Sequence, residues 1–138
     1  MFVSPRFRLI LLAKNSIGEV IMSALPVYKH LDLYNMAKKL VYASYELTHE
    51  LPEDERNVSG QKCRAIVLSA YVYIIQGLSR KNRKKFFKKA QLQLVVLDGF
   101  LEIYKDLDLI DPEKLNDTSY LLVRCLELIK KTDTESNV

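Results

Sequence analysis

Four long stretches of this chain carry apolar residues at spacings of three and four, and only short polar links separate them. The stretches cover about residues 27–50, 59–77, 80–107 and 111–131. Such spacing gathers apolar side chains on one face of an α-helix. Glycine and proline number only four each among 138 residues, too few for the turns of a β-sandwich. Because helices joined by short links pack antiparallel, the sequence predicts an all-α fold, an antiparallel up-down-up-down four-helix bundle.

Each helix has a predicted inner face. The first is expected to bury a stripe widened by three leucines: Leu31, Tyr34, Ala37, Val41, Tyr45 and Thr48, with Leu33, Leu40 and Leu47. The second is apolar on nearly all sides and is expected to be the most buried. The inner faces of the third and fourth helices are predicted to be Phe87, Ala90, Leu94, Leu97, Leu101 and Tyr104, and Leu115, Leu122, Cys125, Leu126 and Ile129.

Local signals predict where the helices begin and end. Pro52 disfavours helix in the residue before it, so the first helix is expected to stop there, and "PEDERNVSG" is expected to be a polar connection. Ser59 is a predicted N-cap of the second helix, and Gly77 a predicted helix end. Asp111 and Pro112 fit the N-cap and the first position of the fourth helix.

The domain organisation is a single bundle with two loose ends. Residues 1–21 are expected to be an N-terminal extension, with Met22 as the natural start. The apolar run inside that extension is too short to span a membrane and has no clear cleavage site for a signal peptide. Residues 22–131 are assigned to the bundle and residues 132–138 to a frayed tail.

Charge is distributed unevenly along the chain. The net charge is only +4, but no Asp or Glu occurs between residues 57 and 97, a stretch with nine Lys or Arg residues. All seventeen acids and the other twelve basic residues lie elsewhere. Such a separation is typical of a protein with an anionic partner: a nucleic acid, a membrane surface or an acidic protein.

The densest part of this charge is "SRKNRKKFFKKAQ", residues 79–91, with seven basic residues and no acid. At helical spacing the lysines cover a broad face while Phe87 turns inward, and Phe86 fits either the core or the surface. Lysine-rich faces bind phosphates through charge, largely without reading sequence.

Catalytic and metal-binding patterns are sparse. No phosphate-binding glycine loop is present, and the only histidines, His30 and His49, lie about five turns apart on the first helix. Glu46 and His49 have the Glu-x-x-His spacing of di-iron bundles, but no second copy exists. Cys63 and Cys125 have no CxxC context and are expected to be buried thiols of a cytoplasmic protein. The sequence thus predicts neither an enzyme nor a cofactor.

The bundle resembles a known family in two places. They are the link "LPEDER" followed by "GQKCR", and the turn "LEIYKDLDLID" into the fourth helix. The chain from about residue 25 to 131 is similar to the four-helix-bundle proteins encoded in ribosomal-RNA intervening sequences. It is more similar still to their relatives, the accessory variability determinant proteins of diversity-generating retroelements.

The resemblance implies a barrel-shaped homopentamer that binds a reverse transcriptase and its template RNA and supports mutagenic cDNA synthesis. The candidate contacts to RNA or polymerase are then Arg56, Lys62, Arg64, Arg80, Lys81, Arg83, Lys84, Lys85, Lys88 and Lys89. Eight tyrosines, mainly on helices, fit the rim of the core and a surface between subunits.

Two other functions stay open at this point. One is a protein-interaction adaptor of the intervening-sequence type, whose lysines contact an acidic protein. The other, disfavoured by the single Glu-x-x-His, is a metal-dependent bundle enzyme.

Overall fold

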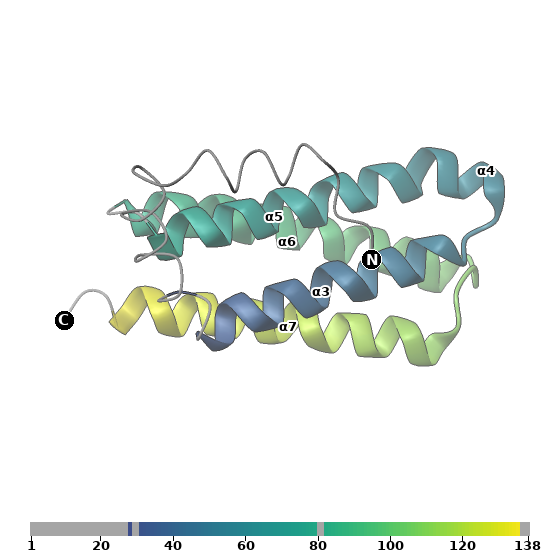
Figure 1. Cartoon of the computed structure of the whole chain (residues 1–138). Coiled ribbons are helices and arrows are strands. Elements are labelled where there is room, and N and C mark those ends of the chain that lie inside the picture. The colour runs from purple at the N-terminus through teal and green to yellow at the C-terminus, as the bar shows by residue number, and fades with distance from the viewer. Residues whose placement is uncertain (1–27, 29–30, 80–81, 136–138) are drawn as a thin grey trace, which may run out of the picture.

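The computed structural model describes residue 28 and residues 31–79 and 82–135, and all regular structure in these ranges is helical. The four long helices and the two short helical turns between the first two of them are α3 (Asp32–His49), α4 (Glu53–Glu55), η1 (Arg56–Gly60), α5 (Gln61–Ser79), α6 (Arg83–Asp106) and α7 (Pro112–Glu135). The long helices lie lengthwise beside one another (Figure 1). The predicted all-α fold with four helices is confirmed. The extension expected at residues 1–21 lies outside the described part.

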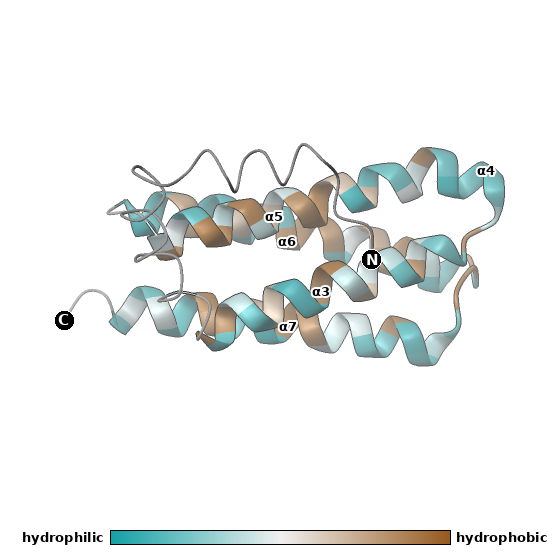
Figure 2. Cartoon of the chain, viewed as in Figure 1, coloured by the Kyte–Doolittle hydropathy of each residue, from teal (hydrophilic) through white to brown (hydrophobic). Residues whose placement is uncertain are grey.

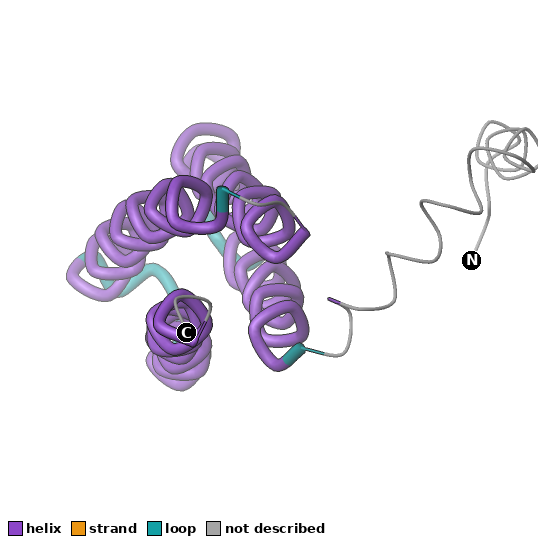
Figure 3. Tube along the Cα trace, turned by 90° about the vertical axis from the view of Figure 1, so that its left-hand side faces the viewer, coloured by secondary structure: helices purple, strands orange, loops and turns teal. Residues whose placement is uncertain are grey.

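Each long helix packs against two others. α3 and α6 both contact α5 and α7, and seen nearly end-on the four helices surround a common interior (Figure 3). The links after α3 and after α6 lie at one end of the molecule, and the end of α5 and the start of α6 lie at the other (Figure 1). Contacts agree with this path, since Glu50 at the end of α3 pairs with Lys114 at the start of α7.

The core follows the predicted spacing closely on α6 and less closely on α3. On α6 the six predicted residues, from Phe87 to Tyr104, are all buried. On α3 the buried face is centred on the leucines, and Leu31 and Tyr45 are exposed. The reason is that Leu33, Leu40 and Leu47 form their own stripe, which leaves the amphipathic tyrosines at its edge. Figure 2 shows brown apolar turns alternating with teal polar ones along each helix.

Two expectations about the inner faces are corrected in detail. On α7, Leu126 is only half-buried, and Leu128 is buried beside Ile129. α5 is not covered on all sides, because Leu68 and Val72 are exposed on its outer face.

The segment predicted to be a polar connection is wound into helix instead. Pro52 precedes α4, and the chain continues through the π-helical η1 into α5 without a break. Ser59 is therefore not an N-cap. Its hydroxyl bonds the Glu55 carboxylate and lies 2.9 Å from the Tyr104 hydroxyl on α6. Short polar side chains can bond backbone and neighbours in several ways, so the residue type alone does not specify a cap.

The other predicted ends have mixed outcomes. Asp111 does cap α7, accepting a hydrogen bond from the Glu113 N–H at 3.3 Å. Gly77 does not end α5, which continues to Ser79. α7 continues to Glu135, beyond the start of the tail expected at residue 132, and residues 136–138 lie outside the described ranges.

Candidate nucleic-acid interface

The first turns of α6 display a group of lysines, here called the lysine cluster: Lys84, Lys85, Lys88 and Lys89. All four are exposed. The ion pairs found within the described residues are Lys114–Glu50 and Arg124–Glu127, so no carboxylate there neutralises the cluster. Lys89 lies with its Nζ 5.7 Å from the centre of the Tyr73 ring on α5, a weak cation–π contact. The cluster therefore presents unneutralised positive charge to solvent.

The N-terminus of α6 adds to this positive field. Asn82 occupies the N-cap but makes no side-chain hydrogen bond to the first turn. The partial positive charge of a helix N-terminus thus coincides with four ammonium groups, an arrangement that costs helix stability. A bound anion would offset that cost.

The two phenylalanines of this segment have different environments. Phe87 is only 1 % exposed and packs in the core, whereas Phe86 is half-buried. Neither is presented as an exposed ring among the lysines, so stacking of nucleic-acid bases on this face has no structural support.

Arg83 is tied to the fold rather than displayed. It is half-buried, and its Nε donates a hydrogen bond to the Gly77 carbonyl at 3.1 Å. This bond joins the start of α6 to the last turn of α5. Arg80 and Lys81, the first two basic residues of the predicted site, lie outside the described residues.

Arg56, Lys62 and Arg64 lie at the opposite end of α5, where that helix begins (Figure 1). Lys62 is exposed, whereas Arg56 is half-buried and donates from Nη2 to the Leu51 carbonyl at 3.1 Å. The predicted basic residues consequently do not form one continuous patch within a single chain.

Arg64 makes the most contacts of the three. Its Nε donates to Thr48 Oγ1 at 2.8 Å and its Nη2 to the Tyr45 carbonyl at 3.3 Å. Its guanidinium also lies 4.7 Å from the centre of the Tyr45 ring. This side chain fastens α5 to α3.

Because Arg64 is held in this way, Arg64→Gln is expected to lower the free energy of unfolding by about 1.5–3 kcal/mol, the range for hydrogen bonds to a charged group. Urea unfolding followed by circular dichroism measures the change. Lys62→Gln, two residues earlier and exposed, is the control and is expected to change stability by less than about 0.5 kcal/mol. Equal stability of the two variants would contradict a structural role for Arg64.

The tyrosines divide between the core rim and the surface. Tyr28, Tyr34 and Tyr71 group between α3 and α5, with the Tyr34 and Tyr71 hydroxyls 3.4 Å apart. Burial, followed by the hydrogen bond to Tyr34, raises the pKa of Tyr71. Tyr42 and Tyr120 are exposed. The expectation of tyrosines at the rim of the core therefore holds for the half-buried group, whereas Tyr104 is completely buried.

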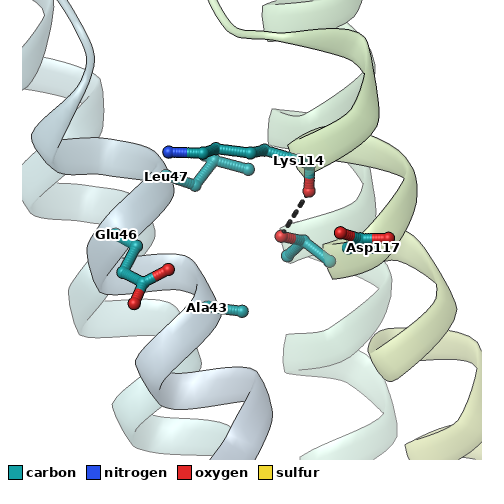
Figure 4. A pocket seen from close by; sticks show the side chains of 6 residues that line it. Ala43, Glu46, Leu47, Lys114 and Asp117 are labelled. Atoms are coloured by element: carbon teal, nitrogen blue, oxygen red, sulfur yellow. Dashed lines mark hydrogen bonds between the residues drawn. The ribbon is translucent and has the colours of Figure 1, made fainter.

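The cleft between α3 and α7 is small. It is lined by Ala43, Glu46, Leu47, Lys114, Asp117 and Thr118 and measures about 70 Å³ (Figure 4). That volume holds a few water molecules. The Thr118 hydroxyl donates to the Lys114 carbonyl at 2.8 Å, so this polar group is already satisfied.

The described residues also show no grouping of metal ligands. Within the described residues no three His, Cys, Asp or Glu side chains are grouped as a metal site would require. Glu46 and His49, the pair with Glu-x-x-His spacing, are both exposed near the end of α3.

A second apolar stripe, on the outer face of α6, is absent from the sequence-based predictions. Leu92, Val95, Val96 and Ile103 are all about half exposed or more. They recur at spacings of three, one and seven, on the side opposite the buried stripe. The segment "LQLVVLDGFLEI" contains more apolar residues than one helix face can hold. This excess indicates a second apolar face, which the prediction of a single inner face does not include.

Comparison with known proteins adds no assignment. No protein-family model matches the chain, and no curated protein matches it. Within the described residues, no helix combines the length and the apolar character needed to cross a membrane.

Proposed function

We propose that this protein is a non-catalytic accessory protein that binds RNA through the lysine cluster of α6. The observation that carries the proposal is that these four lysines are exposed, close together and without carboxylate partners among the described residues. An anionic polymer would neutralise them and release its own counterions, which is the main source of affinity for such surfaces.

The resemblance of the sequence makes the proposal more specific. The RNA is then the template of a diversity-generating retroelement, and the second partner is its reverse transcriptase in the cytoplasm. The protein takes no chemical step. It holds template and polymerase together during mutagenic cDNA synthesis.

The same resemblance underlies the proposed assembly. Antiparallel up-down-up-down bundles would form a ring or barrel, a homopentamer. Exposed tyrosines such as Tyr42 and Tyr120 support contacts between copies, because tyrosine is enriched at subunit interfaces. In a ring, Lys62 of one copy and the lysine cluster of another could face one RNA, although they lie apart within one chain.

The RNA-binding role is tested by charge reversal. For about five phosphate contacts, log K against log salt should have a slope of roughly −3.5 to −4.5. Lys84→Glu/Lys85→Glu is expected to reduce that slope by roughly 1.4–1.8 and to weaken binding at 0.1 M salt by about 25-fold or more. Titration of a structured RNA at several salt concentrations measures both quantities.

The matched control is Lys39→Glu/Lys105→Glu, which makes the same change in net charge at exposed positions on α3 and near the end of α6. It is expected to weaken RNA binding by a few-fold only, through long-range charge. If both double variants lose the same affinity, the lysine cluster is not the binding surface.

A protein-interaction adaptor is the second candidate, and the exposed apolar stripe of α6 favours it. The discriminating observation is co-purification of an acidic protein that survives nuclease treatment and is lost in Lys84→Glu/Lys85→Glu. Under the proposed function, nuclease treatment removes that association.

A further inference from the structure

The outer face of α6 is apolar in its middle and oppositely charged at its two ends. The exposed apolar residues Leu92, Val95, Val96 and Ile103 occupy the middle, with Leu92 and Val95 about 60 % exposed. Lys88 precedes them on the same face, and Asp106 follows them. Glu102 and Lys84 line the edge that faces α7. All these charged side chains are exposed, and none forms an ion pair with another described residue.

This order of charges is complementary to itself. When a second copy of α6 is laid antiparallel on the first, the basic end of each helix meets the acidic end of the other. With the two-fold axis near Val95 and Val96, Lys88 faces Glu102 of the other copy, and Lys84 faces Asp106. Such two-fold contacts use one surface twice, as in most dimers of identical chains.

The middle of the stripe fits the same arrangement. Gly99 is exposed, and a methyl group added to it would have no neighbour within 4 Å. In the antiparallel pair Gly99 lies opposite Leu92 of the other copy, so the smallest residue of the stripe meets one of its largest. Small residues at a helix crossing let the two backbones come close.

We infer that the outer face of α6 is the surface at which two copies of this chain pair, antiparallel and about a two-fold axis near Val96. A face of about 36 Å, the length of 24 helical residues, buries on the order of 1,000 Å² in total, at the low end for specific interfaces. The pairing is therefore concentration-dependent. It is separate from any contact that closes a ring, because a ring joins two different surfaces of each chain.

An unrelated partner is less well supported by the same face. An unrelated helix would have to place an acidic end against the basic end of α6 and a basic end against its acidic end. A second copy of α6, laid antiparallel, already meets this requirement. Lys85 and Lys89 lie outside the proposed ion pairs, whereas Lys84 and Lys88 take part in them, so pairing of two copies competes with RNA for these two lysines.

Single cysteines test the geometry, with RNA removed by nuclease. Val96→Cys lies near the axis and is expected to form an intermolecular disulfide under mild oxidation. Ile103→Cys is expected not to cross-link to itself, because antiparallel copies hold the two residues roughly 20 Å apart. A mixture of Ile103→Cys with Lys88→Cys is expected to cross-link. The native thiols are buried and add little background.

Tyr120→Cys, which is exposed on α7, is the control for random collision. If Val96→Cys forms disulfide no faster than Tyr120→Cys, the α6 pairing is wrong. If Ile103→Cys cross-links to itself as fast as Val96→Cys, the pairing is not antiparallel, and the inference fails in that form too.

Charge exchange provides an independent readout. Lys88→Glu and Glu102→Lys are each expected to weaken dimerisation about tenfold, measured by sedimentation equilibrium, because each creates two like-charge contacts across the axis. The double variant Lys88→Glu/Glu102→Lys restores opposite charges and is expected to recover most of the affinity. Failure of the double variant to recover, with the single variants impaired, would overturn the proposed pairing of these residues.

Discussion

Replacing Gly77 with alanine is expected to destabilise the protein by about 1–3 kcal/mol, although alanine is the better helix former. A Cβ built at Gly77 lies 2.4 Å from Cε1 and 2.5 Å from Cδ1 of Phe87. Phe87 is 1 % exposed within the core, so its ring cannot move aside without displacing neighbours. The overlap therefore outweighs the gain in helix propensity of about 0.5–1 kcal/mol.

Gly99 provides the matched control for this prediction. It also lies inside a helix, but a methyl group there meets no atom within 4 Å. Gly99→Ala is expected to stabilise the chain by about 0.5–1 kcal/mol. Chemical denaturation at low micromolar protein concentration, where chains are separate, measures both variants. Stabilisation by Gly77→Ala would show that α5 and α6 are not in close contact at Phe87.

A second-site change sharpens the test. Phe87→Leu shortens the side chain that the new methyl group would strike. In the Gly77→Ala background it is expected to cost less than in the parent, with a coupling energy of about 1 kcal/mol or more. Additive effects would mean that the two residues do not contact each other.

Gly77 also illustrates how far the sequence could predict this fold. Repeating apolar positions on α6 predict its core residues, because one helix face suffices to define them. A glycine near the end of an apolar run, however, fits both a helix end and a close approach of two helices. Only the position of Phe87, ten residues later on another helix, decides between them.

In the candidate site, too, the sequence predicts some features and not others. The exposure of Lys84, Lys85 and Lys88 follows from helical spacing and from the lack of acids nearby in sequence. The hydrogen bonds of Arg64 could not be predicted from helical spacing, because its partners Thr48 and Tyr45 lie on a different helix, 16 and 19 residues away. The local sequence pattern predicts which face of its helix a side chain occupies. It does not predict which residues of the neighbouring helix that side chain will contact.

The π-helical turn η1 could not be predicted from nearby residues either, because a contact with a distant residue stabilises it. "PEDERNVSG" contains residues typical of a loop, yet the chain winds through it. Ser59 contacts the hydroxyl of Tyr104, a residue 45 positions later and fully buried. A tertiary contact of this kind can override weak local preferences.

The two cysteines are expected to react with thiol reagents at least about 1,000-fold more slowly in the folded protein than in the unfolded chain, because attack without opening is limited by the small thiolate fraction. Cys63 on α5 and Cys125 on α7 are both completely buried. Burial raises the pKa of each thiol from its ordinary value of 9.0 to about 12, and the nearby charge of Arg64 only partly opposes this for Cys63. Because the thiolate is the reactive form, three pH units correspond to about 1,000-fold less of it at pH 8.

The same shifts set a limit on stability at high pH. A thiol with a raised pKa in the folded state holds its proton more tightly there than when unfolded. Its contribution is complete below pH 9 and is lost as the pH rises from 9 toward 12. Tyr104, whose pKa burial raises to about 12, contributes in the same direction from pH 10 upward. Unfolding in urea at pH 8 and at pH 10.5 is expected to show the lower stability at the higher pH.

The rate at which the cysteines are labelled also measures the destabilisation expected for Gly77→Ala. Native thiols that react only after opening report the free energy of that opening. Gly77→Ala, at a loss of about 2 kcal/mol, is therefore expected to speed the labelling of both cysteines by about 30-fold when opening is global. Ellman's reagent at pH 8 follows the reaction, and both thiols should titrate at once in 6 M guanidinium. A thiol that reacts at the unfolded rate in the native parent would show that its helix does not bury it.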